Sequence, residues 1–374
     1  MLCLTSTEQS FIEILRVAVG SSKYLNKSLD VNEWNEIKLL SVKHALAGVV
    51  FGAIQRLSHS SNCVLPDKKN IIELYSISES YKKRNIEQVN DIVLLSRFLS
   101  DRNFDSCIIK GQALSLYYPS DIVRTPGDID IWVMHKDDVL KDLNSRRHKI
   151  IDLCHEFVGF RRVFYHHTDF PIKGRDIEIH FTPSWMFSPW HNARLQKFYE
   201  REWQHKRLVA NFYSPSPEMD TIHILLHIYR HLFDEGIGLR QVIDYYFVLK
   251  NSVVDKERVL CVMKSIGLIK FAGAMMWILH EVLNMPEEYM LCPANKNRGK
   301  QLLNEIMQAG NFGKYDERLA SINRNSLFSR LKQNIDRNFR LMRNYPSEAF
   351  CSPFWKMWQK IWQFYNGYGA MPSK

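Results

Sequence analysis

The stretch Thr125–Val133, which reads TPGDIDIWV, is the most informative part of the chain. Side chains two residues apart lie on the same face of a strand, so Asp128 and Asp130 are expected to project together. Two carboxylates about 4 Å apart repel each other by roughly 4 kcal/mol at an effective dielectric constant near 20. A divalent cation with oxygen ligands is the simplest way to offset this repulsion. The stretch therefore predicts a metal site for phosphoryl-group chemistry.

A second pattern precedes this stretch. Residues Ile108–Leu114 read IIKGQAL, and a glycine between a strand and a helix lets backbone N–H groups approach a phosphate. Lys110 is placed to neutralise a phosphate, although a solvent-exposed lysine at the sheet edge is the alternative. Arg124 is placed to reach a triphosphate, with a surface guanidinium as the alternative. The predicted nucleotide-binding residues are Lys110, Gly111, Gln112 and Arg124.

A third pattern follows in Asp176–Phe181, which reads DIEIHF. If this strand neighbours the first one, Glu178 completes a cluster of three carboxylates, and Asp176 is its rival for that place. Such a cluster binds two magnesium ions and stabilises the charge that passes to a leaving group. His180 is expected to support the cluster through a hydrogen bond rather than to act as a ligand. The predicted catalytic and metal-binding residues are Asp128, Asp130 and Glu178.

Composition and charge narrow the class of protein to which the chain can belong. With 374 residues, 45% of them hydrophobic, the chain can build sizeable cores and is not of the disordered class. The formal charge of +10 suggests an anionic partner, although an ordinary basic protein is an equally good explanation. Seven scattered cysteines without a CxxC pair indicate a reducing compartment. We expect a cytoplasmic protein, because neither a signal peptide nor an apolar stretch long enough to cross a bilayer is evident.

The pattern of apolar residues changes along the chain and predicts four regions. Apolar residues at helical spacing dominate the beginning, and short apolar runs with turn signals take over after about residue 100. These runs predict strands at 107–109, 129–134, 163–165 and 177–181, with a helix at 136–157. The regions are an N-terminal helical region (1–100), an α/β core (101–210), a C-terminal helical region (211–345) and an aromatic-basic tail (346–374).

The three patterns together resemble the polymerase-β-like nucleotidyltransferase superfamily. The chain is more narrowly similar to the bacterial family of uncharacterised nucleotidyltransferases. This resemblance implies an α+β fold with a mixed β-sheet flanked by helices, and metal-dependent nucleotidyl transfer to an acceptor that is generally unknown. One position departs from the pattern, because Gln112 stands where the superfamily usually has Ser or Gly. The lysine–glycine motif also resembles that of nucleotidyltransferase toxins of the abortive-infection type.

The resemblance extends to a histidine-rich helix. His223, His227 and His231 are spaced to lie on one helical face. They are expected either to face the active-site cleft or to be satisfied in the core. In the cleft, His180, His227 and His231 would contact the acceptor or support the site. Zinc binding by two of them is the less favoured alternative. Arg240 and Asp244, one turn apart, predict a structural ion pair.

The aromatic-basic tail has two interpretations. Trp355, Trp358 and Trp362 recur at helical spacing, which favours packing of a terminal helix onto the body. Binding of nucleic acid or of a membrane surface is the alternative.

Two main hypotheses for function follow. The first is a nucleotidyltransferase that uses a nucleoside triphosphate with two Mg²⁺ ions, or with Mn²⁺, and releases pyrophosphate. Its acceptor would be a small molecule, a sugar, a peptide or RNA. The second is a non-catalytic nucleotide- or RNA-binding protein on the same fold, and a toxin that modifies transfer RNA is a third. Metal-dependent nucleotide binding favours the enzyme, whereas metal-independent and salt-sensitive RNA binding favours the binder.

Overall fold

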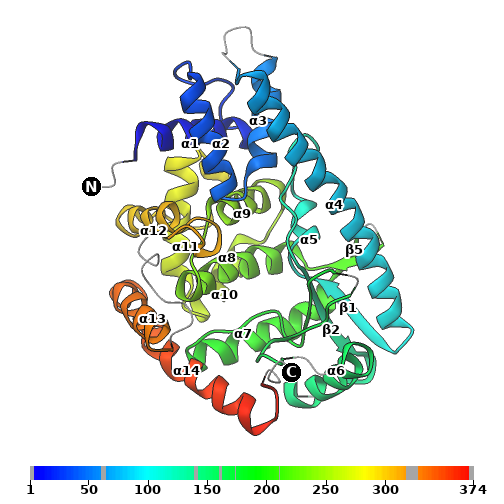
Figure 1. The fold of residues 1–374 in the computed structure, drawn as a ribbon. Coiled ribbons are helices and arrows are strands. Elements are labelled where there is room, and N and C mark those ends of the chain that lie inside the picture. The colour runs from blue at the N-terminus through cyan, green and yellow to red at the C-terminus, as the bar shows by residue number, and fades with distance from the viewer. Residues whose placement is uncertain are drawn as a thin grey trace.

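The computed structural model describes residues 4–59, 65–138, 142–159, 162–172, 174–209, 211–316 and 327–369. Four helices come first along the chain and precede the sheet (Figure 1): α1 (Ser6–Val19), α2 (Val31–Lys43), α3 (Ala47–Ser58) and α4 (Lys68–Ser100). Capping boxes at Thr5 and Asp30 begin the first two helices. Each capping side chain accepts a hydrogen bond from the backbone N–H of the N3 glutamate, whose carboxylate accepts one from the backbone N–H of the capping residue. The long α4 runs from these helices to the sheet.

A mixed four-stranded sheet forms the centre of the α/β part. Its strands are β1 (Phe104–Ile108), β2 (Ile129–His135), β3 (His167–Asp169) and β4 (Ile177–His180). The spatial order is β1-β2-β4-β3, in which only β2 and β4 are parallel. A separate pair of antiparallel strands follows: β5 (Arg207–Val209) and β6 (Phe212–Ser214). The expected α+β class with a mixed sheet is confirmed.

The two faces of the sheet belong to two different apolar cores. Ile131 and Ile179 pack with α4 and with α6 (Leu143–Val158) on one face. Trp132 points to the other face, where it meets Trp203 with ring centroids 4.6 Å apart. Because side chains alternate along a strand, Asp130 lies on the Trp132 face. The sheet therefore presents its acidic side chain toward the C-terminal helices.

Helices form most of the remaining chain. They are α5 (Gln112–Ser115), α7 (Pro189–Glu202), α8 (Pro217–Asp234), α9 (Leu239–Asn251), α10 (Lys256–Ser265), α11 (Ile269–Trp277), α12 (Lys296–Ala309), α13 (Leu327–Met342) and α14 (Pro346–Tyr365). Short 3₁₀ turns lie at Lys136–Asp138, Trp203–His205, Glu287–Tyr289 and Asn311–Gly313, and a π-helical segment lies at Ile278–Val282.

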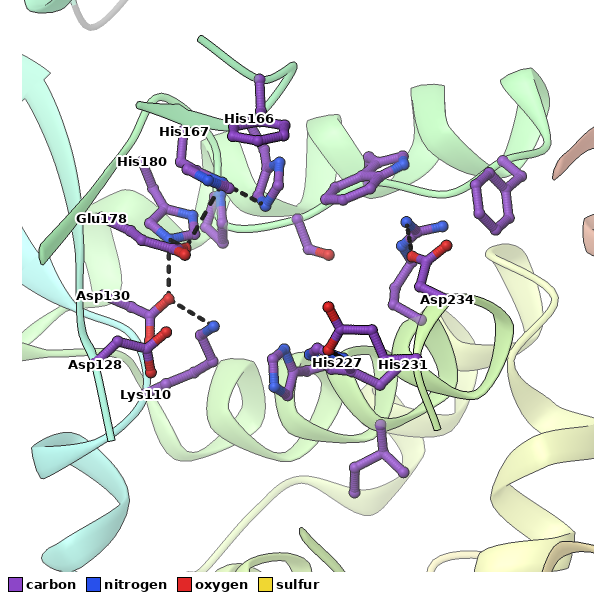
Figure 2. Close-up of a pocket in the computed structure, with 18 of the residues that line it drawn as sticks. Lys110, Asp128, Asp130, His166, His167, Glu178, His180, His227, His231 and Asp234 are labelled. Carbon is purple, nitrogen blue, oxygen red and sulfur yellow. Dashed lines mark hydrogen bonds and ion pairs between the residues drawn. The ribbon is translucent and has the colours of Figure 1, made fainter. Parts of the chain in front are cut away.

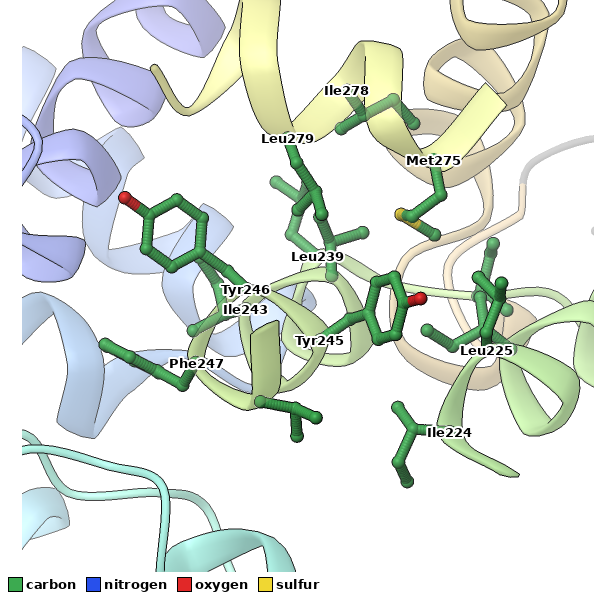
Figure 3. Close-up of a cluster of buried hydrophobic side chains, with 14 of the residues drawn as sticks. Ile224, Leu225, Leu239, Ile243, Tyr245, Tyr246, Phe247, Met275, Ile278 and Leu279 are labelled. Carbon is green, nitrogen blue, oxygen red and sulfur yellow. The ribbon is translucent and has the colours of Figure 1, made fainter. Parts of the chain in front are cut away.

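Helix α9 passes through the middle of the helical part. All of its residues from Leu239 to Leu249 are buried, including both Tyr245 and Tyr246 (Figure 3). The ring of Tyr245 lies near Leu225 of α8 and Met275 of α11, whereas the ring of Tyr246 points to the opposite side of α9. Polar residues of α9 are consequently buried as well, so each needs a partner inside the protein.

Helix α14 packs onto the body on one side only. The ring of Trp355 lies 5.0 Å from that of Tyr165, and the Arg147 guanidinium lies 5.0 Å from the ring centre of Trp362. Phe354 and Phe364, in contrast, are mostly exposed. The expectation that the tail packs holds for these two tryptophans, whereas other aromatic residues of the helix face solvent.

Two expected elements differ from the structure. The strand expected at 163–165 is not formed; Val163 makes an isolated bridge to Thr168, and β3 begins only at His167. The helix expected from residue 136 begins at Leu143, where the Asp142 side chain accepts bonds from the first-turn backbone. Among the described helices, none combines the length and apolar character that crossing a membrane requires.

Candidate active site

A cavity of about 1110 Å³ lies between the sheet, α8 and α14. Figure 2 shows the acidic residues and Lys110 at one end, His227 and His231 along α8, and Asp234 toward the other end. Apart from Gln112, the cavity is bordered by all the residues predicted to bind nucleotide or metal or to support the site: Lys110, Gly111, Arg124, Asp128, Asp130, Glu178, His180, His227 and His231. The rival acid, Asp176, is exposed and does not border it.

Asp130 and Glu178 are brought together by strand pairing. They are register partners on the parallel strands β2 and β4. Lys110 Nζ lies 2.6 Å from Asp130 Oδ1. His180 Nε2 lies 3.0 Å from the same oxygen and 3.3 Å from Glu178 Oε2, so the imidazole bridges the two carboxylates. The expected neighbouring of the two acidic strands is present, and His180 makes the supporting hydrogen bond.

These contacts control the charge of the cluster. Burial alone would raise the pKa of Asp130, but Lys110 and His180 outweigh it and hold that pKa well below its usual range. Burial is likewise outweighed at Glu178, where hydrogen bonding from His180 lowers the pKa. Both carboxylates are therefore ionised at neutral pH.

Asp128 lies immediately before β2 and is exposed to the cavity. The charge of Asp130, followed by burial, raises the pKa of Asp128 above its usual range. The negative charge of Asp128 is less well neutralised than that of Asp130 or Glu178. A bound cation would relieve the repulsion between Asp128 and Asp130. The carboxylates of Asp128, Asp130 and Glu178 are the hard oxygen ligands that Mg²⁺ and Mn²⁺ prefer, so the donor set fits such an ion.

The Lys110–Gln112 segment has a conformation that requires glycine at its centre. Gly111 has φ +55°, and a Cβ there would lie 3.2 Å from the Asp128 carbonyl oxygen. The turn into α5 thus passes close to the acidic pair. Gln112 faces away from the cavity, and its side-chain amide donates to Asn85 (2.9 Å) and Gln88 (2.8 Å). The glutamine side chain ties the turn to α4.

Arg124 is buried and its guanidinium is engaged within the protein. Arg124 Nε and Nη2 lie 2.8 Å and 3.0 Å from the two carboxylate oxygens of Asp244. The Tyr118 hydroxyl donates to the same carboxylate at 2.6 Å. Asp244 was expected to pair with Arg240; the structure gives it Arg124 as the bidentate partner, and Arg240 adds a further electrostatic attraction. Both arginines border the cavity.

The three histidines of α8 separate into two groups. His223 is fully buried and shares a 3.0 Å hydrogen bond with the Tyr199 hydroxyl, and burial lowers its pKa to about 3. His227 and His231 border the cavity with ring centroids 4.3 Å apart. His227 and His231 therefore face the cleft, as one of the two expectations had it. His223 lies in the core, which was the other expectation.

Two histidines that border the cavity were not predicted from the sequence. His166 and His167, at the start of β3, border the cavity beside Glu178. His167 Nδ1 lies 3.6 Å from Glu178 Oε2 and 2.9 Å from His166 Nε2. Burial lowers the pKa of His167 to about 4 and that of His166 well below its usual value, so both rings are neutral at neutral pH. The only signal in the sequence is the adjacent histidine pair, of which His167 lies eleven residues before Glu178.

Comparison with known proteins identifies the family to which the chain belongs. The family described as "Uncharacterised nucleotidyltransferase" matches residues 30–284, which is more than half of the chain. The chain belongs to this family, as the three motifs predicted. Helices α12, α13 and α14 lie beyond the matched residues.

Other comparisons add little. No curated protein matches the chain. Among solved structures, the chain is similar to an antigenic nucleotidyltransferase-like protein from Paracoccidioides brasiliensis, with 13% sequence identity over 52% of this chain and 91% of that one. The TM-score of 0.30 is too low for this likeness to support a conclusion.

Proposed function

We propose that this protein transfers a nucleoside monophosphate from a nucleoside triphosphate to an acceptor and releases pyrophosphate. The observation that carries the proposal is the pairing of Asp130 with Glu178 on neighbouring parallel strands, with Asp128 facing the same cavity. Membership of a nucleotidyltransferase family supports the same role. A cavity of about 1110 Å³ has room for a nucleotide and for part of an acceptor.

In this proposal Asp128, Asp130 and Glu178 hold two Mg²⁺ ions, or Mn²⁺. Bound divalent ions stabilise the negative charge on the attacking and leaving oxygens of phosphoryl transfer. The acceptor hydroxyl oxygen forms a bond to the α-phosphorus while the bond from that phosphorus to the β-bridging oxygen breaks. Where Glu178 does not bind the second ion, its carboxylate, which is ionised at neutral pH, accepts the proton of the hydroxyl. Pyrophosphate leaves with the bridging oxygen.

The remaining residues of the proposal bind and position. Lys110, which neutralises Asp130 in the structure, would turn to the phosphates, and Gly111 would let the nucleotide approach the backbone. Arg124 and Gln112 are engaged with Asp244, Asn85 and Gln88, so we assign them to holding the loops around the site. His227 and His231, on the opposite wall, would face the acceptor.

A labelling experiment tests the proposal. The full chain is incubated with each labelled nucleoside triphosphate, Mg²⁺ or Mn²⁺ and a cell extract, and the labelled product is identified. Asp128→Asn and Asp130→Asn should abolish metal-dependent labelling. Asp176→Asn, which changes an acid outside the cavity, should leave it intact. Labelling that persists in the first two variants would refute the assignment.

A further inference from the structure

Three imidazole rings gather where β3 meets β4, beside the carboxylate cluster (Figure 2). The centroid of the His166 ring lies 4.2 Å from that of His167 and 5.2 Å from that of His180. The rings of His167 and His180 are 5.3 Å apart. One ligand atom from each of these three side chains can be chosen so that all lie within 4.8 Å of one another.

The spacing of the facing atoms matches a shared ion. Metal–nitrogen bonds of about 2.1 Å place neighbouring ligand atoms about 3.4 Å apart in a tetrahedron and about 3.0 Å apart in an octahedron. His180 Nε2 lies 3.3 Å from Glu178 Oε2, and that oxygen lies 3.6 Å from His167 Nδ1. His167 Nδ1 lies 2.9 Å from His166 Nε2. Each of these three contacts joins two atoms at a distance that two ligands of one ion also have. The three histidines are the set whose ligand atoms all lie within 4.8 Å of one another, and Glu178 contacts two of them, His167 and His180.

The burial of these rings gives a second reason. The Nδ1 atoms of His166 and His180 are buried and, within the described part of the chain, have no hydrogen-bond partner. Each ring consequently makes its polar contacts through Nε2, on the side of the cluster. The Nε2 atoms of both rings therefore point into the cluster, on the side where a shared ion would lie.

We propose that His166, His167, His180 and Glu178 form a site for one divalent transition-metal ion of the Zn²⁺ type. Three nitrogen ligands and one carboxylate suit Zn²⁺, whereas Mg²⁺ prefers oxygen ligands. Glu178 lies between this site and Asp130, so a bound ion would fix the position of the third carboxylate. The proposal goes beyond nucleotidyl transfer, because binding of the ion requires neither nucleotide nor acceptor.

Metal titration of the full-length chain tests the proposal. Metal-free protein is titrated with Zn²⁺ by calorimetry, and with Co²⁺ while visible absorption is recorded, since its spectrum reports nitrogen ligation and geometry. We expect one ion per chain, retained in millimolar Mg²⁺. His167→Ala and the more conservative His167→Gln should each weaken binding by more than about tenfold. Thermal unfolding of each variant shows whether it is folded.

Two controls separate the outcomes. His231→Ala removes a histidine from the opposite wall and should leave Zn²⁺ affinity unchanged. Asp128→Asn should abolish nucleotidyl transfer while Zn²⁺ still binds, so failure of one proposal does not imply failure of the other. Absence of stoichiometric binding, or binding that survives both His167 substitutions and a folded His166→Gln variant, would overturn the metal site. Equal loss in His231→Ala would also overturn it.

Discussion

Arg124 and Asp244 form a buried bidentate ion pair although they lie 120 residues apart in the sequence, with N–O distances of 2.8 Å and 3.0 Å. The pair connects the loop that leads to Asp128 with helix α9. Tyr118 donates a third hydrogen bond to the same carboxylate at 2.6 Å. The ion pair therefore helps to position the loop from which the acidic motif begins.

Removing one partner of this pair should destabilise the protein strongly. Asp244→Asn would leave the Arg124 guanidinium buried without its counter-charge, and breaking a buried pair costs about 3–5 kcal/mol. The free energy of unfolding, measured in urea, checks this. The matched control is Asp121→Asn, which breaks the partly exposed bidentate pair with Arg56 and should cost about 1 kcal/mol or less. Equal costs for the two variants would contradict the prediction.

Asp128→Asn should stabilise the metal-free protein even though it removes activity. The pKa of Asp128 is raised in the folded state, so the folded state favours the protonated form. Ionised Asp128 consequently costs stability once the pH rises through that raised pKa, and the amide variant avoids this cost. We expect a gain of up to about 1 kcal/mol at pH 7, because the exposed carboxylate is screened by water. The gain should vanish at low pH.

The midpoint of thermal unfolding, measured without metal from pH 3 to pH 8, checks this prediction. Mg²⁺ should raise the midpoint of the native chain more than that of Asp128→Asn, because the native chain keeps all three carboxylates. A variant that is less stable than the native chain at pH 7 in metal-free buffer would show that Asp128 makes a favourable contact instead.

Lys110→Met should destabilise the metal-free protein, and Mg²⁺ should restore the loss. Lys110 Nζ is 2.6 Å from Asp130 Oδ1, and hydrogen bonds to charged groups contribute about 1.5–3 kcal/mol. A divalent cation bound by Asp130 would supply the missing positive charge. Thermal unfolding with and without Mg²⁺ checks this. Substitution of the exposed Lys82 by Met serves as the control. If Mg²⁺ stabilises native and variant chains equally, Lys110 is not the counter-charge of the metal site.

The acidic strands could be predicted because their signal is local. Alternation of apolar and acidic residues predicted both the strand of Asp130 and that of Glu178, and the expected pairing of the two strands is present. The three-residue β3 could not be predicted this way, since it is too short to show a period. It forms because His167–Asp169 pairs with β4, which is a tertiary contact.

The hydrogen-bond and ion-pair partners of charged and polar side chains could not be predicted from the neighbouring sequence. Arg124 was expected to face a triphosphate, yet its partner Asp244 lies on a helix far along the chain. Gln112 was placed beside the phosphates, yet its side-chain amide N–H groups donate to the side-chain oxygens of Asn85 and Gln88 on α4. In both cases the sequence located the residue near the site but not the direction of its side chain. Packing between distant segments decides that direction.

The last prediction concerns His44, which is fully buried between α2 and α9 and whose Nδ1 accepts a hydrogen bond from the Leu239 backbone at 3.3 Å. Burial lowers its pKa from the ordinary 6.5 to about 3. Between these two values the unfolded chain binds a proton at this residue and the folded chain does not. The folded state therefore loses stability as the pH falls from about 6.5 toward 3, by about 1.4 kcal/mol per pH unit at most.

His44→Asn keeps an acceptor for the Leu239 N–H but cannot become charged. Its free energy of unfolding, measured in urea between pH 6.5 and pH 4, should fall less steeply with acidification than that of the native chain. The difference in slope should be up to about 1.4 kcal/mol per pH unit. Parallel curves for the native chain and His44→Asn would mean that His44 becomes protonated without opening the interface between α2 and α9.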